Sequence, residues 1–253
     1  MRVGVLGGGP LGRAVADPLA RGDVAGCELA GTVTSRSPAD DRIALREAAV
    51  VVEAAGVPAV AERVPELLEH GCTVVLCSCA ALADPGVADT LGRSGPGRVL
   101  VPAGALGGLD LAVAAVRGDH TASVRLTTTK SPTALAAGAA GEVFRGTARD
   151  AALAFPRTAN VAAALALVTV GLDATEVVVR ADPDVVRTRH EVVVDGRLGR
   201  HRLVTENAVV EGSAGRTSAL TAWSVVVLLE ALASGRPALA AHRLPNPAAV
   251  ITP

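Results

Sequence analysis

The sequence predicts an α/β protein in which a Rossmann-type doubly wound parallel sheet is followed by a second α+β domain with a mixed or antiparallel sheet. Three observations support this prediction. Residues 1–100 alternate short apolar runs with helical stretches, a glycine-rich segment follows the first run, and the pattern changes after Gly107-Gly108. Short apolar runs are typical of parallel strands buried on both faces, and their alternation with helices predicts the doubly wound arrangement.

The first sheet is expected to take its strands from apolar runs at residues 3–6, 28–33, 50–54, 73–78 and 98–101. Helical stretches between them cover residues 13–20, 59–70 and 85–93. Ligands of such a sheet bind at the carboxyl ends of its strands. Small residues follow several strands, among them Ala54-Ala55-Gly56 and Ala103-Gly104-Ala105, and they would leave room for a flat cofactor.

The second half of the chain begins with an expected helix at 109–116 and a strand at 123–129, followed by a Gly/Ala-rich stretch at 131–141. A helix is expected from Thr147, where Asp150 completes a capping-box-like start. Phe155-Pro156-Arg157 interrupts it before an apolar helix at 160–170. Further strands are expected at 175–180, 190–194 and 200–206, the last two forming a hairpin that turns at Asp195-Gly196, and a final helix at about 217–234.

These elements predict three parts of the chain. Residues 1–107 are expected to bind a dinucleotide, residues 108–216 to form an α+β catalytic and dimerisation domain, and residues 235–253 to be a loosely held tail. The final helix could pack back on the first domain.

The glycine-rich segment Gly7-Gly8-Gly9-Pro10-Leu11-Gly12 lies between the first strand and the first helix. Gly7 would permit the tight turn, Gly9 would let the backbone approach a pyrophosphate, and Gly12 would let the helix pack close to the strand. The helix dipole and the unpaired N–H groups of the first turn, which includes Pro10 and Leu11, would then bind the phosphates. A plain βα turn is the alternative, but the position favours a dinucleotide site.

The second strand ends without the Asp or Glu that normally holds the ribose 2′-hydroxyl of NAD. The chain continues as Thr34-Ser35-Arg36-Ser37. Hydroxyl groups and a guanidinium suit a 2′-phosphate at least as well, because arginine can pair with phosphate in a bidentate way. Arg36 as a solvated loop residue is the alternative. Ser35 and Arg36 are therefore candidate contacts to a cofactor that is NAD or NADP.

Composition excludes several classes of protein. A net charge of −1 gives no electrostatic case for nucleic acid or a membrane surface, and no apolar run reaches the length of a membrane span. The chain enters a strand directly, so no secretory signal is expected. Cys77-Ser78-Cys79 has the wrong spacing for a CxxC pair and adjoins no histidine cluster, so we expect buried thiols in a cytoplasmic protein and no metal site.

His190 is the candidate for proton transfer among the five histidines, because it opens a strand beside arginines and histidine titrates near neutral pH. A structural histidine is the alternative. Asn160 at a helix start is either an N-cap or a contact to a nicotinamide carboxamide or ribose. Lys130, Arg157 and Arg216 are candidate anchors for substrate carboxylates, or ordinary surface charges.

Four blocks of sequence resemble the L-aspartate dehydrogenase family. The resemblance runs in order through nearly the whole chain, and it includes the glycine segment and Leu82-Ala-Asp-Pro-Gly86. The combination is specific, although no single block is. The blocks are Pro102-Ala-Gly-Ala-Leu-Gly-Gly-Leu-Asp110, Phe155-Pro-Arg-Thr-Ala-Asn-Val-Ala-Ala163, Ala181-Asp-Pro183 with His190, and Thr217-Ser-Ala-Leu-Thr-Ala-Trp-Ser224.

The resemblance implies an NAD(P)-dependent homodimer that oxidises L-aspartate to iminosuccinate, which hydrolyses to oxaloacetate and ammonia or feeds NAD biosynthesis. It places the catalytic histidine at His190 and the NAD-contacting residues at Ala105 and Asn160. Lys130, Arg216 and Thr217 are the residues we then expect at the substrate, a small dicarboxylic amino acid.

Two departures from the family pattern bear on substrate specificity. Thr188 stands where the family tends to have Asn, and Ser213-Ala-Gly-Arg-Thr-Ser218 stands where it often has Asn-Pro-Lys-Thr-Ser. Arg216 keeps the charge of that lysine but not its geometry. A reductase or dehydrogenase of another small oxo- or imino-acid, and a non-catalytic NAD(P)-sensing protein, therefore remain as alternatives.

Overall fold

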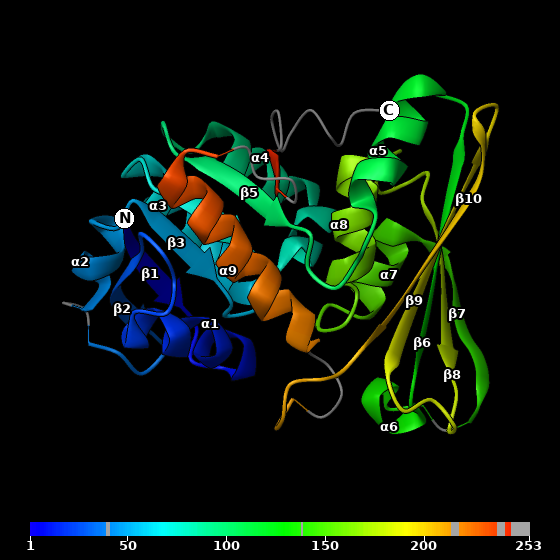
Figure 1. Cartoon of the computed structure of the whole chain (residues 1–253), viewed down its shortest axis with the longest axis horizontal. Coiled ribbons are helices and arrows are strands. Elements are labelled where there is room, and N and C mark those ends of the chain that lie inside the picture. Colours follow the sequence, from blue (N-terminus) through cyan, green and yellow to red (C-terminus); the bar gives the residue numbers. More distant parts are fainter. Residues whose placement is uncertain (39–40, 138, 214–217, 237–240, 244–253) are drawn as a thin grey trace.

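The computed structural model describes residues 1–38, 41–137, 139–213, 218–236 and 241–243, which form two β-sheets with helices packed on them (Figure 1). The first sheet has the strand order β11-β5-β4-β3-β1-β2, and the second has the order β10-β9-β6-β8-β7. The predicted fold class is confirmed, since β1 to β5 are parallel and the second sheet is mixed.

The strands of the first sheet lie close to their predicted positions. They are β1 (Arg2–Leu6), β2 (Glu28–Val33), β3 (Val50–Glu53), β4 (Thr73–Leu76) and β5 (Arg98–Pro102). The helices are α1 (Pro10–Arg21), α2 (Asp41–Arg46), α3 (Val57–Glu69) and α4 (Pro85–Arg93), with a 3-10 helix η1 (Cys79–Ala83) before α4. α2 and η1 were not predicted, because such short segments show no helical period.

The side chains of β1 alternate between two layers of the core. Val3 and Val5 pack with Val15 of α1 and Leu229 of α9 (Ala219–Ser234). Gly4 faces the opposite layer, where a β-carbon would overlap Leu45 of α2. α9 follows the second sheet in the chain and yet packs against α1 and β5 of the first.

The second sheet consists of β6 (Ser123–Lys130), β7 (Gly141–Thr147), β8 (Glu176–Ala181), β9 (Thr188–Gly196) and β10 (Gly199–Asn207). Its helices are α5 (Leu109–Gly118), α6 (Pro132–Leu135), α7 (Ala148–Ala154) and α8 (Asn160–Val168). The predicted capping box of Thr147 and Asp150 starts α7. α7 and α8 lie between the two sheets, where α8 packs against η1 (Figure 1). α8 is apolar around its circumference, so it can be buried on all sides.

The predicted position of the β9–β10 turn is wrong. β9 continues through Asp195-Gly196, and the turn lies at Arg197-Leu198. The buried carboxylate of Asp119 accepts a hydrogen bond from the Arg197 backbone N–H at 2.6 Å, and a β-carbon at Gly196 would overlap that carboxylate. This tertiary contact overrides the local turn preference of Asp-Gly.

Two strands had no counterpart in the sequence prediction. β7 pairs antiparallel with β8, and a register shift between Glu142 and Phe144 breaks the alternation by which a strand is recognised. β11 (Ala241–Arg243) lies within the predicted tail and pairs antiparallel with β5. Three residues are too few to show a period. The domain boundaries at residues 107 and 216 stay a prediction.

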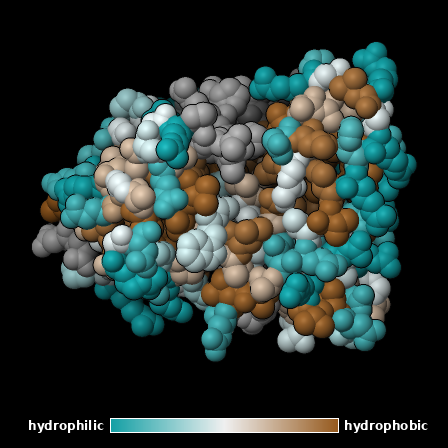
Figure 2. All heavy atoms as spheres, viewed as in Figure 1, coloured by the Kyte–Doolittle hydropathy of each residue, from teal (hydrophilic) through white to brown (hydrophobic). Residues whose placement is uncertain are grey.

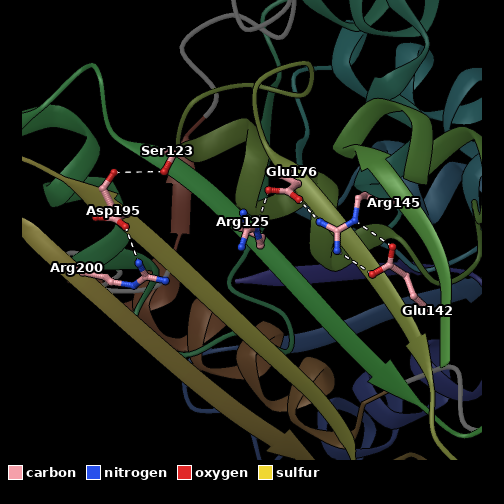
Figure 3. A network of polar contacts seen from close by, with 7 residues as sticks. All are labelled: Ser123, Arg125, Glu142, Arg145, Glu176, Asp195 and Arg200. Atoms are coloured by element: carbon pink, nitrogen blue, oxygen red, sulfur yellow. Dashed lines mark hydrogen bonds and ion pairs between the residues drawn. The ribbon is translucent and has the colours of Figure 1, made fainter.

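The outer face of the second sheet carries a polar network (Figure 3). Glu176 of β8 accepts hydrogen bonds from Arg125 of β6 and Arg145 of β7, and Arg145 also pairs with Glu142. Figure 2 shows polar surface at the β10 side of the molecule and apolar surface over α9, where Leu220, Trp223 and Val227 are exposed. Among the described helices, none has the length and apolar character needed to cross a membrane.

Candidate functional site

The glycine segment forms the turn between β1 and α1. Gly7 has a φ of +120°, and a β-carbon there would lie 2.5 Å from the backbone of Ala54. At Gly12 a β-carbon would lie 1.9 Å from the Gly7 carbonyl oxygen. Among the described residues, nothing lies within 4 Å of a β-carbon position at Gly9. A pyrophosphate-binding turn requires this combination of a strained turn, a close helix and an open backbone face.

The N-terminus of α1 opens toward the same face. Gly9 is its N-cap and supplies no side chain, and Pro10 is the first helical residue. The amides of Leu11 and Gly12 therefore have no side-chain cap, and the helix dipole adds positive potential there. The Arg13 guanidinium donates to the Gly8 carbonyl oxygen at 2.7 Å, which holds the turn in place.

A cleft of about 530 Å³ lies at the carboxyl ends of β1, β2 and β3. Its walls are the turn at Gly7–Gly9, the segment 34–36 after β2, the pair Ala54-Ala55, and side chains of α3. Ser35 and Arg36, both exposed, line the cleft, and their contact with a cofactor stays a prediction. The residues present thus fit a dinucleotide whose phosphates lie on α1 and whose adenosine lies beside β2.

Glu53 at the end of β3 is fully buried and was missed by the sequence argument. One carboxylate oxygen accepts hydrogen bonds from the backbone of Ala55 and Gly56 and from the Ser78 hydroxyl, and the other accepts from the Ser78 backbone N–H. Burial raises the pKa of Glu53, and these hydrogen bonds lower it again in part. Glu53 fixes the loops after β3 and β4, and its signal was an acidic residue closing an apolar run.

Asn160 is the first residue of α8, and Ala159 is the N-cap, so the N-cap interpretation is wrong. The Asn160 Oδ1 accepts a hydrogen bond from the Ala80 backbone N–H at 3.0 Å, and the Asn160 carbonyl oxygen accepts from the Cys79 thiol. Asn160 therefore joins α8 to η1. Burial raises the pKa of Cys79 to about 12, so this thiol stays protonated and structural.

Ala105 lies buried in the loop after β5. Its carbonyl oxygen accepts a hydrogen bond from Asn207 Nδ2 at 2.9 Å, and the neighbouring Gly104 N–H donates to Ser224 Oγ at 3.1 Å. The loop that carries a predicted cofactor contact is thereby held by β10 and α9.

His190 lies on the buried face of β9, which it shares with Val192 and Val194, and it is only 2% exposed. Its Nδ1 is 3.0 Å from Thr128 Oγ1 on β6. Lys130 shares that face of β6 and is 4% exposed. Thr128 and Lys130 line a cavity of about 10 Å³ together with Thr158 and Ala159 before α8.

The electrostatics of His190 follow from this setting. Burial, and then the nearby charge of Lys130, lower the pKa of His190 to about 3. The free protein therefore holds a neutral imidazole at neutral pH. An anion bound by Lys130 would offset the ammonium charge and raise that pKa.

His190 was expected to open a strand beside arginines, but β9 begins two residues earlier, at Thr188, and Arg189 does not share the face of His190. Arg189 points to the opposite face of β9, because successive side chains alternate, and it pairs with Glu191 at 3.0 Å. Arg157 is exposed in the segment between α7 and α8. Arg216 and Thr217 lie outside the described residues.

The structure gathers the candidate residues in two places. Gly7, Gly9, Ser35 and Arg36 meet in the cleft of the first sheet. His190 and Lys130 meet at the second sheet, with Thr128 as a partner that the sequence argument also missed. Its signal was its two-residue spacing from Lys130, which directly follows the strand expected at 123–129.

Models of known protein families match both the N-terminal and the C-terminal half of the chain. The model of the family described as aspartate dehydrogenase, C-terminal, matches residues 110–232. That described as homoserine dehydrogenase, NAD binding domain, matches residues 14–93.

Relatives resemble the chain over most of its length. L-aspartate dehydrogenase 3 of Bordetella bronchiseptica is 34% identical over 92% of this chain and 95% of its own. L-aspartate dehydrogenase of Methanothermobacter thermautotrophicus is 38% identical over 81% of this chain and 80% of its own. The crystal structure of aspartate dehydrogenase from Thermotoga maritima has a TM-score of 0.69 at 25% identity, covering 92% of this chain and 96% of that one.

Glu53→Gln should lower the free energy of unfolding by about 1–3 kcal/mol, the usual cost of a buried unsatisfied polar group. The glutamine amide would place a donor opposite the Ser78 backbone N–H, which now donates to Glu53. Urea unfolding followed by circular dichroism measures the difference. Glu47→Gln is the matched control at an exposed pair with Arg2 and should change nothing measurable. Equal stability of Glu53→Gln and the wild type would contradict the assignment.

His190 should make the protein less stable as pH falls. The pKa of a histidine in the unfolded chain is about 6.5, whereas the pKa of His190 in the folded chain is about 3. The free energy of unfolding that His190 contributes above pH 6.5 is therefore lost as the pH falls toward 3, by on the order of 5 kcal/mol.

His190→Asn removes this contribution, so its unfolding free energy should depend less on pH than that of the wild type in urea titrations across the acid range. His120→Asn, at an exposed histidine, should keep the wild-type dependence. A His190→Asn protein with the wild-type slope would refute the buried neutral state.

Proposed function

The chain belongs to the L-aspartate dehydrogenase family, and from this premise we propose that His190 is the acid/base residue of its reaction. The protein is an NAD(P)-dependent amino-acid dehydrogenase. It catalyses the oxidative deamination of L-aspartate to iminosuccinate, which gives oxaloacetate and ammonia, or the reverse reductive amination. This activity is consistent with a role in NAD biosynthesis.

The observation that carries the proposal for His190 is its burial beside Thr128 and Lys130 on the sheet that faces α8. Asn160, at the start of the same helix, is bonded to η1 of the nucleotide-binding half. One helix thus connects the acid/base group with the cofactor half of the molecule.

The proton chemistry follows from the hydrogen bond of His190. For Nε2 to act as a base, the imidazole hydrogen must lie on Nδ1 and be donated to Thr128 Oγ1, which is 3.0 Å away. Lys130 binds a substrate carboxylate, and this contact raises the pKa of His190 toward the working range. His190 then takes up a proton as water attacks the imine.

The nicotinamide cofactor, NAD or NADP, accepts the hydride from the α-carbon when bound. We assign its pyrophosphate to the turn formed by Gly7, Gly9 and Gly12 and to the first turn of α1, at Pro10 and Leu11. Ser35 and Arg36 contact its adenosine end. Ala105 and Asn160 contact its nicotinamide end, with Asn160 Nδ2 as donor because Oδ1 is bonded to Ala80.

The division of the chain is part of the same proposal. Residues 1–107 bind the dinucleotide and residues 108–216 carry catalysis and dimerisation. Lys130, Arg216 and Thr217 are the proposed contacts to L-aspartate.

His190→Ala should lower kcat by about a hundredfold or more, the usual contribution of general acid–base catalysis, and leave cofactor affinity near that of the wild type. The assay follows the absorbance of the reduced nicotinamide with L-aspartate and either NAD or NADP, and with oxaloacetate and ammonia in reverse. His120→Ala controls for loss of a histidine at an exposed position.

Near-normal turnover by His190→Ala would remove the residue from the mechanism. If the wild-type enzyme turned over another imino acid but not aspartate, that imino acid would replace aspartate as the proposed substrate. Tight cofactor binding without any turnover would indicate a sensor.

A homodimer in the cytoplasm completes the proposal. No described helix packs on the outer face of the second sheet (Figure 1), which leaves this face for a second copy. The four cysteines are free thiols, as suits a reducing compartment. Light scattering after size exclusion should give twice the mass of the 25.2 kDa chain, and a monomer at micromolar concentration would contradict dimerisation.

A further inference from the structure

Arginines from two separate elements line the cleft of the first sheet. Arg36 lies in the segment after β2, and Arg63 lies on α3, on the other wall of the cleft. Within the described part of the chain, neither side chain forms an ion pair. Two guanidinium groups thus face the cleft, one from each of two walls.

The other charges in the cleft do not cancel this pair. Arg46 and Glu66 form an ion pair with each other and are neutral together. Glu62, exposed on α3, is the remaining carboxylate of the lining. The lining therefore keeps one positive charge in excess, and among the described residues its arginines outside any ion pair are Arg36 after β2 and Arg63 on α3.

The segment after β2 is built without a carboxylate. Residues 34–38 read Thr-Ser-Arg-Ser-Pro. The Thr34 N–H donates to Ser37 Oγ at 3.0 Å, and the Arg36 N–H donates to Thr34 Oγ1 at 3.2 Å. This local turn uses Thr34 and Ser37, and it leaves the side chains of Ser35 and Arg36 exposed on the cleft.

We propose that Arg36, Arg63 and Ser35 form a subsite for a ribose 2′-phosphate, and that the enzyme therefore prefers NADP to NAD. The inference rests on the proposed function only in that a nicotinamide dinucleotide occupies this cleft. A dianion between two guanidinium groups gains charge-assisted hydrogen bonds that the ribose hydroxyl of NAD cannot match. A carboxylate after β2, which would repel the phosphate, is absent from residues 34–38.

Glu62, in the same cleft, could instead favour NAD over NADP. Its carboxylate could accept hydrogen bonds from the ribose hydroxyls of NAD, which would make α3 rather than the β2 segment decide specificity. The two arrangements predict opposite effects when the Glu62 charge is removed.

Isothermal titration of the full-length protein without amino acid tests the subsite. NADP+ should bind at least about tenfold more tightly than NAD+, and 2′,5′-ADP should bind more tightly than ADP by a similar factor. The preference should shrink as salt is added, because exposed charges are screened. Equal binding of each pair, or tighter NAD+, would overturn the proposal.

Variants assign the effect to residues. Arg36→Ala and Arg63→Ala should each weaken NADP+ and 2′,5′-ADP by about tenfold and leave NAD+ within about twofold. Arg117→Ala, at an exposed arginine of α5, is the matched control and should change neither. An Arg63→Ala protein that loses NAD+ and NADP+ equally would remove Arg63 from the subsite.

Glu62→Gln separates the two arrangements. It should tighten NADP+ binding and leave NAD+ unchanged, since it removes a carboxylate near the phosphate. Weaker NAD+ binding by this variant would show that Glu62 holds the ribose hydroxyls and would overturn the preference.

Failure here is distinguishable from failure of the proposed function. Cofactor binding is measured without substrate. If the protein oxidises aspartate but binds NAD+ more tightly than NADP+, only the proposed phosphate subsite is refuted. If the protein prefers NADP+ but does not turn over aspartate, the phosphate subsite is supported and the substrate assignment is refuted.

Discussion

The buried carboxylate of Glu53 is the constraint on which the arrangement of the site depends. It lies at the end of a central strand, and burial of a charge is costly unless hydrogen bonds satisfy its oxygens. Four donors from two loops do so, three from the backbone and one from the Ser78 hydroxyl. The loop after β3 supports the glycine turn, because Gly7 contacts Ala54 closely. The loop after β4 leads into η1, which binds Asn160.

α8 connects these loops to the second sheet, because it packs against η1 and lies between the two sheets (Figure 1). A helix that is apolar on all sides is stable only between other elements, and here α7, η1 and the sheet cover it. Its N-terminal end lies at the small cavity lined by Thr128 and Lys130. The same burial that stabilises this packing removes water from His190, so a neutral imidazole and a cation lie close together.

The pleat of β9 places the buried His190 and the surface charges on opposite faces of one strand. His190 and Arg189 are neighbours in sequence, yet one lies under the helices and the other lies on the outer face with Glu191. The outer face pairs its charges across strands, as Figure 3 shows for Arg125, Glu176 and Arg145. Alternate residues of β9 thus lie in the buried site and on the polar outer surface.

The sequence by itself determined the fold class, the glycine turn and nearly every strand, because these depend on local patterns of apolar residues and on backbone freedom at glycine. It also singled out His190, through strand position and family resemblance, and named Lys130 as a candidate carboxylate anchor through its charge. Only the tertiary structure determined the position of the turn after Gly196, the hydrogen-bond partners of Glu53 and the neighbours of His190. Each of these depends on residues distant in the chain, such as Asp119, Ser78 and Thr128, and a local pattern carries no information about which distant group fills a buried position.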